Sequence, residues 1–177
     1  MQFAELCAAN PYAVLELTAD GQLIEMTPAG GETGRRNNRV GFQLERWALS
    51  QGDWCVFDSS TGFLLPDGSV RSPNASVVRL ERWQGLTSAQ REGFPPLCPD
   101  LVVELASPSD ALPALRRKMA TYIDNGAQLG WLLLPTERCI EVWSPTHEPQ
   151  VRQQASSVSG APLLPGLQLD LEDIWTD

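Results

Sequence analysis

A glutamate inside a short apolar run is the feature that most constrains the fold of this chain. The run Leu101-Val102-Val103-Glu104-Leu105 has the length and composition of a buried strand. Alternation along a strand places Leu101 and Val103 on one face and Val102 and Glu104 on the other. A charged carboxylate in such a run needs a partner, which a metal ion, a lysine or a hydrogen-bond network can supply. Glu104 is therefore the first candidate for a functional residue.

The length and composition favour one globular domain. With 177 residues, 42% of them hydrophobic, the chain can bury a substantial core, and we expect a single domain over residues 1–177. No apolar run approaches the roughly 20 residues of a membrane-spanning helix, and the N-terminal residues lack the basic start and apolar core of a signal peptide. Four scattered cysteines and one histidine form no zinc motif, so we expect free thiols in a cytoplasmic protein.

The net charge limits the partners of the chain. A formal charge of −9 argues against a protein whose whole surface binds nucleic acid, because phosphate binding is largely electrostatic. This charge does not exclude a local basic groove, or a site where metal ions offset carboxylates. The basic cluster of Arg35, Arg36 and Arg39 is either a solvated helix start or a contact for phosphate.

Hydrophobic periodicity predicts an α/β (α+β) chain with a mixed sheet and a few helices. We expect strands at 13–17, 22–26, 54–57, 62–65, 75–79, 101–105, 128–134, 139–143 and 151–154. We expect helices at 34–51, from about 110 to 124, and near 171–175, with a helical turn at 87–91. Thr33 is the expected N-cap of the first helix, and Ser109 or Asp110 that of the second.

Lys118 follows Glu104 by fourteen positions, on the helix expected directly after its strand. A helix that returns over the sheet can lay the lysine stem along it and bring the ammonium towards Glu104. Such a pair suits a metal-dependent phosphodiesterase, in which carboxylates hold a divalent cation and a lysine orients water or stabilises developing charge. The alternative is a helix-surface lysine beside a buried carboxylate.

Three further acidic residues each have two interpretations. Asp100 either caps a turn or joins the metal ligands, and Asp110 either caps the helix or is a ligand. Glu45 is either a solvated helix edge or a further group that reaches the same site. The chain has no Gly-x-Gly-x-x-Gly, P-loop or Gly-x-Ser-x-Gly motif, and we expect His147 to be exposed.

Six blocks of the sequence occur in the order and spacing of one known family. They are Leu23–Pro28, Thr61–Gly68, Val70–Pro73, Pro99–Asp110, Lys118 with Tyr122, and the strand of Trp131. Together they resemble the Uma-type putative restriction endonuclease family, which is abundant in cyanobacteria and belongs to the PD-(D/E)XK nuclease-like superfamily. The similarity runs from about residue 12 to 175, which is nearly the whole chain.

This resemblance implies a restriction-endonuclease-like fold, in which a central mixed β-sheet is flanked by helices and the site lies at one sheet edge. It implies a first metal carboxylate from a Pro-Asp pair before the Ala75 strand, a second from Glu104, and a catalytic lysine at Lys118. The cofactor would be Mg²⁺ or Mn²⁺, and the substrate would be DNA, cleaved by attack of water on a phosphodiester. Because many enzymes of the superfamily dimerise, we also expect a homodimer.

The chain departs from the family pattern at Pro73-Asn74, where the pattern has Pro-Asp. Asparagine offers a carbonyl oxygen without the negative charge, and opposite charges about 4 Å apart attract by several kcal/mol at moderate effective dielectric. Asp100, Asp58 or Glu45 could compensate for the lost charge.

Two hypotheses about function follow. The first is a Mg²⁺-dependent endodeoxyribonuclease with Glu104, Lys118, Asn74 and Glu45 in the catalytic site, and with Glu104, Asn74 and Asp100 as candidate metal ligands. The second is a catalytically degenerate member of the family that acts as a binding or interaction module. The substitution at position 74 and the acidic charge favour the second, whereas the retained Glu104 and Lys118 favour the first.

Overall fold

A six-stranded mixed sheet organises the chain, of which the computed structural model describes residues 3–176. The strand order is β10-β9-β8-β7-β6-β3, and within this sheet only β7 and β8 pair in parallel. The strands are β3 (Trp54–Asp58), β6 (Ala75–Arg79), β7 (Leu101–Leu105), β8 (Leu129–Leu134), β9 (Cys139–Ser144) and β10 (His147–Gln153). A short 3-10 turn, η1 (Pro135–Glu137), connects β8 to β9.

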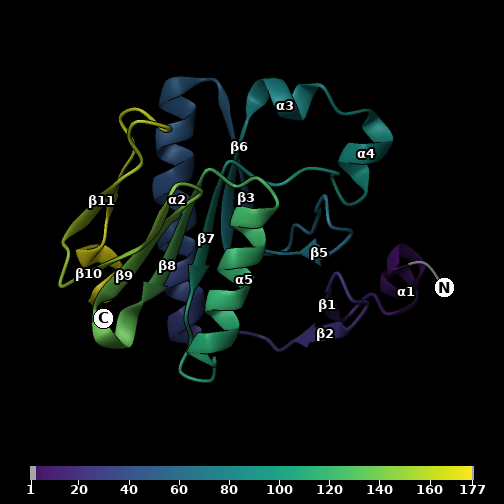
Figure 1. The fold of residues 1–177 in the computed structure, drawn as a ribbon, viewed down its shortest axis with the longest axis horizontal. Helices are drawn as coiled ribbons and strands as arrows, with labels where there is room; N and C mark the ends of the chain where they lie inside the picture. Colours follow the sequence, from purple (N-terminus) through teal and green to yellow (C-terminus); the bar gives the residue numbers. More distant parts are fainter. Residues whose placement is uncertain (1–2, 177) are drawn as a thin grey trace.

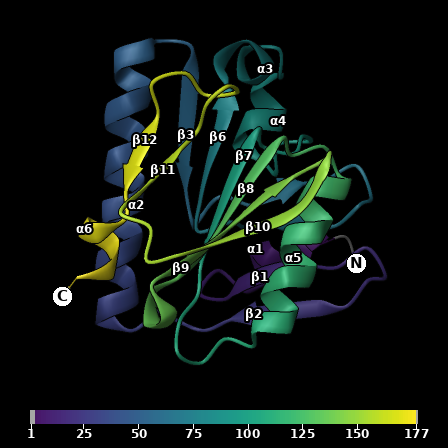
Figure 2. The same cartoon turned by 60° about the vertical axis from the view of Figure 1, so that its left-hand side comes forward.

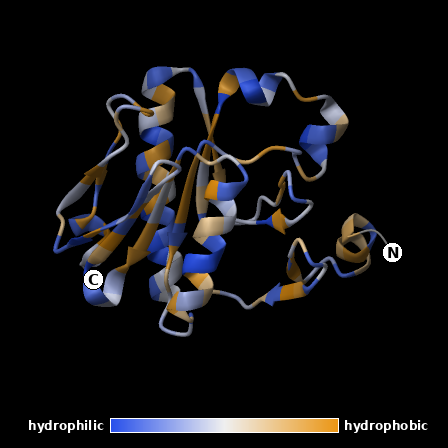
Figure 3. Ribbon diagram, viewed as in Figure 1, coloured by the Kyte–Doolittle hydropathy of each residue, from blue (hydrophilic) through white to orange (hydrophobic). Residues whose placement is uncertain are grey.

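Two long helices, α2 (Gly31–Gln51) and α5 (Leu112–Asp124), cover opposite faces of this sheet (Figures 1 and 2). The α2 face packs on a core that includes Leu44 and Val103, and the α5 face on one that includes Met119 and Val102. All five residues of β7 are therefore buried, which explains its continuous apolar sequence. Figure 3 shows hydrophobic residues along the central strands and a mixture of hydrophobic and hydrophilic residues along the helices.

A smaller sheet lies beside the main one, with the strand order β2-β1-β5-β4. Its strands are β1 (Val14–Leu17), β2 (Leu23–Met26), β4 (Phe63–Leu64) and β5 (Val70–Arg71), and the helix α1 (Phe3–Ala9) precedes them. The hairpin of β1 and β2 pairs over four residues, but β1 pairs with β5 only at Leu17 and Val70. The hairpin is thus tied to the rest of the sheet by a short contact, far from the C-terminus in Figures 1 and 2.

The C-terminal segment covers α2. It contains β11 (Ser157–Ser159), β12 (Gln168–Asp170) and α6 (Glu172–Trp175). Elsewhere in the chain, α3 (Leu80–Gln84) and α4 (Ser88–Glu92) form the connection that follows β6 and precedes β7. The Trp47 indole N–H donates to the Pro165 carbonyl at 2.9 Å, and Arg39 pairs with Asp173 at 2.8 Å. The basic cluster predicted at the start of this helix is therefore engaged in ion pairs, since Arg35 and Arg36 both pair with Glu32.

The structure confirms the expected architecture, a central mixed sheet flanked by helices, and places the main elements within a few residues of their predicted bounds. The predicted caps were wrong. The first long helix begins at Gly31 with Gly30 as its N-cap, so Thr33 lies inside it, and Ala111 is the N-cap of α5. The Asp110 carboxylate instead accepts hydrogen bonds from the N–H and hydroxyl of Ser107.

The elements that the sequence did not predict are α1, β5, α3, β11 and β12, all of which are too short to carry a periodic pattern. The four cysteines are free thiols, as expected, and His147 is exposed. Within residues 3–176, no helix combines the length and the apolar character needed to cross a membrane.

Candidate active site

The pairing of β3, β6 and β7 brings three polar residues to one edge of the main sheet. Asp58 ends β3 opposite Ala75, and Ala75 lies opposite Val103. Asn74 directly precedes β6, so it reaches the end of β7 beside Glu104. The Asn74 side-chain oxygen accepts the Leu105 backbone N–H at 2.9 Å, and this bond fixes the amide against the neighbouring strand.

The Glu104 carboxylate is buried and has two partners on α5. Only 3% of the residue is exposed. The Lys118 ammonium lies 2.9 Å from Oε1, and the Tyr122 hydroxyl donates to the same oxygen at 3.0 Å. Lys118 and Tyr122 are four positions apart on a helix and therefore share a face. The contact predicted between the lysine and the glutamate is present.

A second buried glutamate shares the lysine. The Glu16 carboxylate of β1 lies 2.8 Å from the Lys118 ammonium, which also donates to the Ser72 carbonyl at 3.1 Å. Glu16 accepts the Ser72 backbone N–H at 2.8 Å and pairs with the Arg71 guanidinium at 3.1 Å. These two carboxylates and two cations, Glu16, Glu104, Arg71 and Lys118, form what we call the ion cluster, whose formal charges cancel.

Burial and the neighbouring charges set the protonation of this cluster. Burial raises the pKa of Glu104 above the usual value for a glutamate, and the charge on Lys118 offsets only part of that effect. Burial by itself would lower the pKa of Lys118, but Glu104 and Glu16 outweigh it and the net shift is upward. Burial and the Glu104 charge raise the pKa of Tyr122 well above its usual value. At neutral pH, Lys118 is therefore a cation and Tyr122 a neutral donor.

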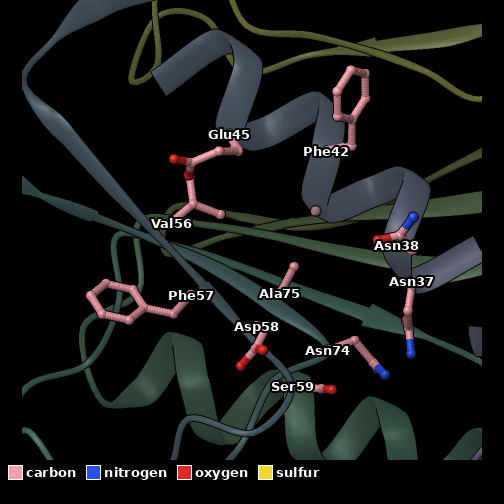
Figure 4. Close-up of a pocket in the computed structure, with 11 residues that line it drawn as sticks. Asn37, Asn38, Phe42, Glu45, Val56, Phe57, Asp58, Ser59, Asn74 and Ala75 are labelled. Carbon is pink, nitrogen blue, oxygen red and sulfur yellow. The ribbon is translucent and has the colours of Figure 1, made fainter. Parts of the chain in front are cut away.

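A pocket of about 450 Å³ opens on the α2 side of the same sheet edge. Figure 4 shows Glu45 and Phe42 projecting from α2, with Asp58 and Asn74 on the strand ends across from them. Glu45 thus shares a pocket with Asn74, whereas Glu104 and Lys118 meet on the α5 face of the sheet. The structure therefore divides the predicted catalytic residues between the two faces, with Asn74 at the edge between them.

Asp100 lies at the other end of β7 and is not brought to Glu104. Four residue steps along an extended chain separate the two by about 13 Å. The Asp100 carboxylate pairs with Arg82 at 2.8 Å and accepts the Arg79 backbone N–H at 2.8 Å. These contacts match the alternative in which Asp100 caps a turn and is not a metal ligand. Among residues 3–176, no three or more His, Cys, Asp or Glu side chains are grouped as they would be around a metal ion.

Glu16 and Arg71 belong to the ion cluster but were not predicted from the sequence. One signal was available: Glu16 stands between Leu15 and Leu17 in a short extended run, as Glu104 stands in its own. Nothing in the local sequence pairs residue 16 with residue 118, because that contact depends on how the hairpin packs against α5.

Comparisons with known proteins agree with this architecture. A family model described as Uma2, putative restriction endonuclease, matches residues 1–172. The fold is similar to the crystal structure of a putative nuclease belonging to DUF820 from Anabaena variabilis ATCC 29413. That similarity has a TM-score of 0.77 and 19% sequence identity, and it covers 92% of this chain and 89% of the other. A search of the curated proteins gives no match.

The raised pKa of Glu104 predicts a pH dependence of stability. Between the ordinary value of 4.5 and the raised pKa, the folded chain holds a proton on Glu104 that the unfolded chain has lost. The stabilisation from this group is complete below pH 4.5 and disappears as the pH rises through the folded pKa. Urea unfolding should therefore show the native chain gaining stability relative to Glu104→Gln as the pH falls from 7 to 5.

The control is Glu141→Gln, which changes another buried glutamate of the same sheet, one on β9 that pairs with Arg116 of α5. Carboxylates shared by the native chain and the Glu104→Gln variant cancel in the comparison. A stability difference that stays constant from pH 7 to pH 5 would contradict the assignment.

Proposed function

The chain belongs to the Uma2 family of putative restriction endonucleases, and on that premise we propose that it is a metal-dependent endonuclease of the PD-(D/E)XK type that hydrolyses DNA phosphodiester bonds. The observation that carries the proposal is the 2.9 Å contact between Lys118 and Glu104 at a sheet edge that Asn74 also reaches. A carboxylate, an oxygen ligand on the adjoining strand and a fixed lysine are the parts that metal-assisted phosphodiester hydrolysis requires.

The residues at this edge offer oxygen atoms, which suit a Mg²⁺ or Mn²⁺ ion. Both contacts of Glu104 fall on Oε1, and within the described chain Oε2 accepts no hydrogen bond, so one carboxylate oxygen is available. The Asn74 carbonyl oxygen accepts a single N–H and keeps a second lone pair. We propose Glu104 and Asn74 as the ligands, and we leave out Asp100 because of its distance. A bound ion would activate water and offset phosphate charge.

The other residues of the site act through charge and position. Lys118 remains protonated at neutral pH, so it would stabilise negative charge on phosphate oxygens and would not accept a proton. Tyr122 holds the Glu104 carboxylate in place through its hydroxyl. Glu45 faces the pocket beside Asn74, and we propose it as an accessory carboxylate on that side.

A second candidate function is binding without catalysis. It is favoured by the amide at position 74 and by the cancelled charges of the ion cluster, because a divalent cation binds less well where the surrounding net charge is zero. In this alternative the fold is retained as an interaction module, and Asn74 serves only to hold β6 against β7.

Cleavage of supercoiled plasmid in Mg²⁺ and in Mn²⁺ distinguishes the two functions. We expect nicking by the native chain, a loss of about 10²–10³-fold in Glu104→Gln and in Lys118→Met, and little change in Glu141→Gln. Circular dichroism and melting curves would verify that each variant is folded. Activity that appears only in Asn74→Asp would mean that the rest of the site is intact and that the missing carboxylate at position 74 prevents catalysis. If the native chain and Asn74→Asp are both inert, the nuclease proposal is wrong.

The asparagine also predicts weak metal binding, which can be measured without a substrate. Replacing Asn74 with aspartate adds one negative charge next to the proposed ion, so we expect the affinity for Mn²⁺ to rise at least about tenfold, equivalent to roughly 1.4 kcal/mol. Titration calorimetry or Mn²⁺ electron paramagnetic resonance would measure this change. Equal Mn²⁺ affinity in the native chain and in Asn74→Asp would place any bound ion elsewhere.

We also propose that the protein is cytoplasmic and forms a homodimer. The four free cysteines are compatible with a reducing compartment. A dimer would present two copies of the site, one for each strand of a duplex. Light scattering at micromolar concentration should give twice the chain mass of 19.4 kDa, and a monomer would contradict this part of the proposal.

A further inference from the structure

The donors around Glu16 all come from outside its own hairpin. The Ser72 backbone N–H, the Arg71 guanidinium and the Lys118 ammonium converge on one carboxylate, at 2.8, 3.1 and 2.8 Å respectively. Arg71 and Ser72 belong to β5 and the residue after it, and Lys118 belongs to α5, whereas Glu16 enters on β1. The body of the molecule therefore provides a buried site with two cations and one amide, which is a set of donors for an anion.

Glu16 leaves one of these donors unused. Arg71 is only 8% exposed, and its Nε–H is buried without a hydrogen-bond partner. A carboxylate has two oxygens, and the Ser72, Lys118 and Arg71 contacts already use both of them. An anion with more oxygens would satisfy the guanidinium better, since a guanidinium matches phosphate through several N–H groups at once.

Apart from the contacts of Glu16, little backbone pairing holds this hairpin to the body, since β1 joins β5 at the single pair of Leu17 and Val70. In the present arrangement Glu16 is 2% exposed and Glu104 is 3% exposed, so the proposed nuclease centre is covered. The Lys118 ammonium is engaged by Glu16, Glu104 and the Ser72 carbonyl, so a phosphodiester that pairs with it has to replace one of these acceptors.

We propose that Arg71, Lys118 and the Ser72 N–H form a phosphate-binding site, and that Glu16 is its internal occupant, which a phosphate group displaces when the β1–β2 hairpin moves. This inference rests on the proposed function for the identity of the phosphate group, which would be that of a nucleic-acid backbone. It predicts that removing the Glu16 carboxylate turns the site into one for a free phosphate ion.

The test measures the melting temperature of Glu16→Ala in sodium phosphate, in sodium formate and in sodium chloride at equal ionic strength. We expect phosphate to raise the melting temperature of the variant by several degrees, more than formate does, and chloride to have no such effect. The native chain should show no phosphate-specific shift. Glu141→Ala is the matched control, because it removes a buried glutamate that pairs with Arg116 and, within residues 3–176, contacts no second cation or backbone amide.

Three outcomes would overturn the proposal. The first is an equal melting temperature of Glu16→Ala in phosphate and in chloride. The second is a rise in melting temperature with formate as large as that with phosphate, which would mean that the site fits only a carboxylate. Where Glu16→Ala does not fold in any buffer, Glu16→Gln replaces it, since the amide keeps the shape of the side chain. A Glu16→Gln variant without a phosphate-specific rise in melting temperature is the third outcome.

Measuring DNA binding shows whether the phosphate group belongs to a nucleic-acid backbone or to a small molecule. We expect Glu16→Gln to bind a short duplex more tightly than the native chain does, with a steeper dependence on salt, because Lys118 and Arg71 become available to backbone phosphates. Stabilisation by phosphate without this gain would assign the site to a free phosphate or a monoester. Neither measurement requires cleavage, so an inactive chain that binds phosphate would reject the nuclease proposal and leave the phosphate site standing.

Discussion

The ammonium of Lys118, shared between Glu104 and Glu16, is the interaction on which the rest of the site depends. It joins three parts of the chain that are distant in sequence: the N-terminal hairpin, the central strand β7 and the helix α5. Removing one partner from a buried ion pair costs about 3–5 kcal/mol, because the remaining charge is left without compensation. The cluster therefore specifies where the hairpin docks, and it holds the Lys118 ammonium beside Glu104.

Much of the site follows from features that can be read along the chain. A glutamate in an apolar strand, followed by a lysine on the returning helix, predicted the contact between Glu104 and Lys118, because a strand and the helix after it pack together. The hairpin, the two long helices and the central strand were also predicted, because each has a clear hydrophobic period or turn signal. Glu16 and Arg71 could not be placed, because their contacts depend on the docking of a separate small sheet.

Asparagine at position 74 preserves the fold but weakens the proposed metal chemistry. Its side chain performs a structural task that aspartate would also perform, accepting the Leu105 N–H where β6 meets β7. The fold is therefore insensitive to the exchange, whereas metal affinity depends directly on the missing charge. Glu45 and Asp58 carry charge into the adjacent pocket, but they reach it on the α2 side, away from Lys118.

A crystal structure with a short DNA duplex and Ca²⁺, which takes oxygen ligands as Mg²⁺ does, tests the account most directly. We predict a backbone phosphate within hydrogen-bond distance of Lys118 and Arg71, the ion on Glu104 and Asn74, and the Glu16 carboxylate moved away with its hairpin. DNA bound on another face, with Lys118 still held between Glu16 and Glu104, would contradict the proposed site.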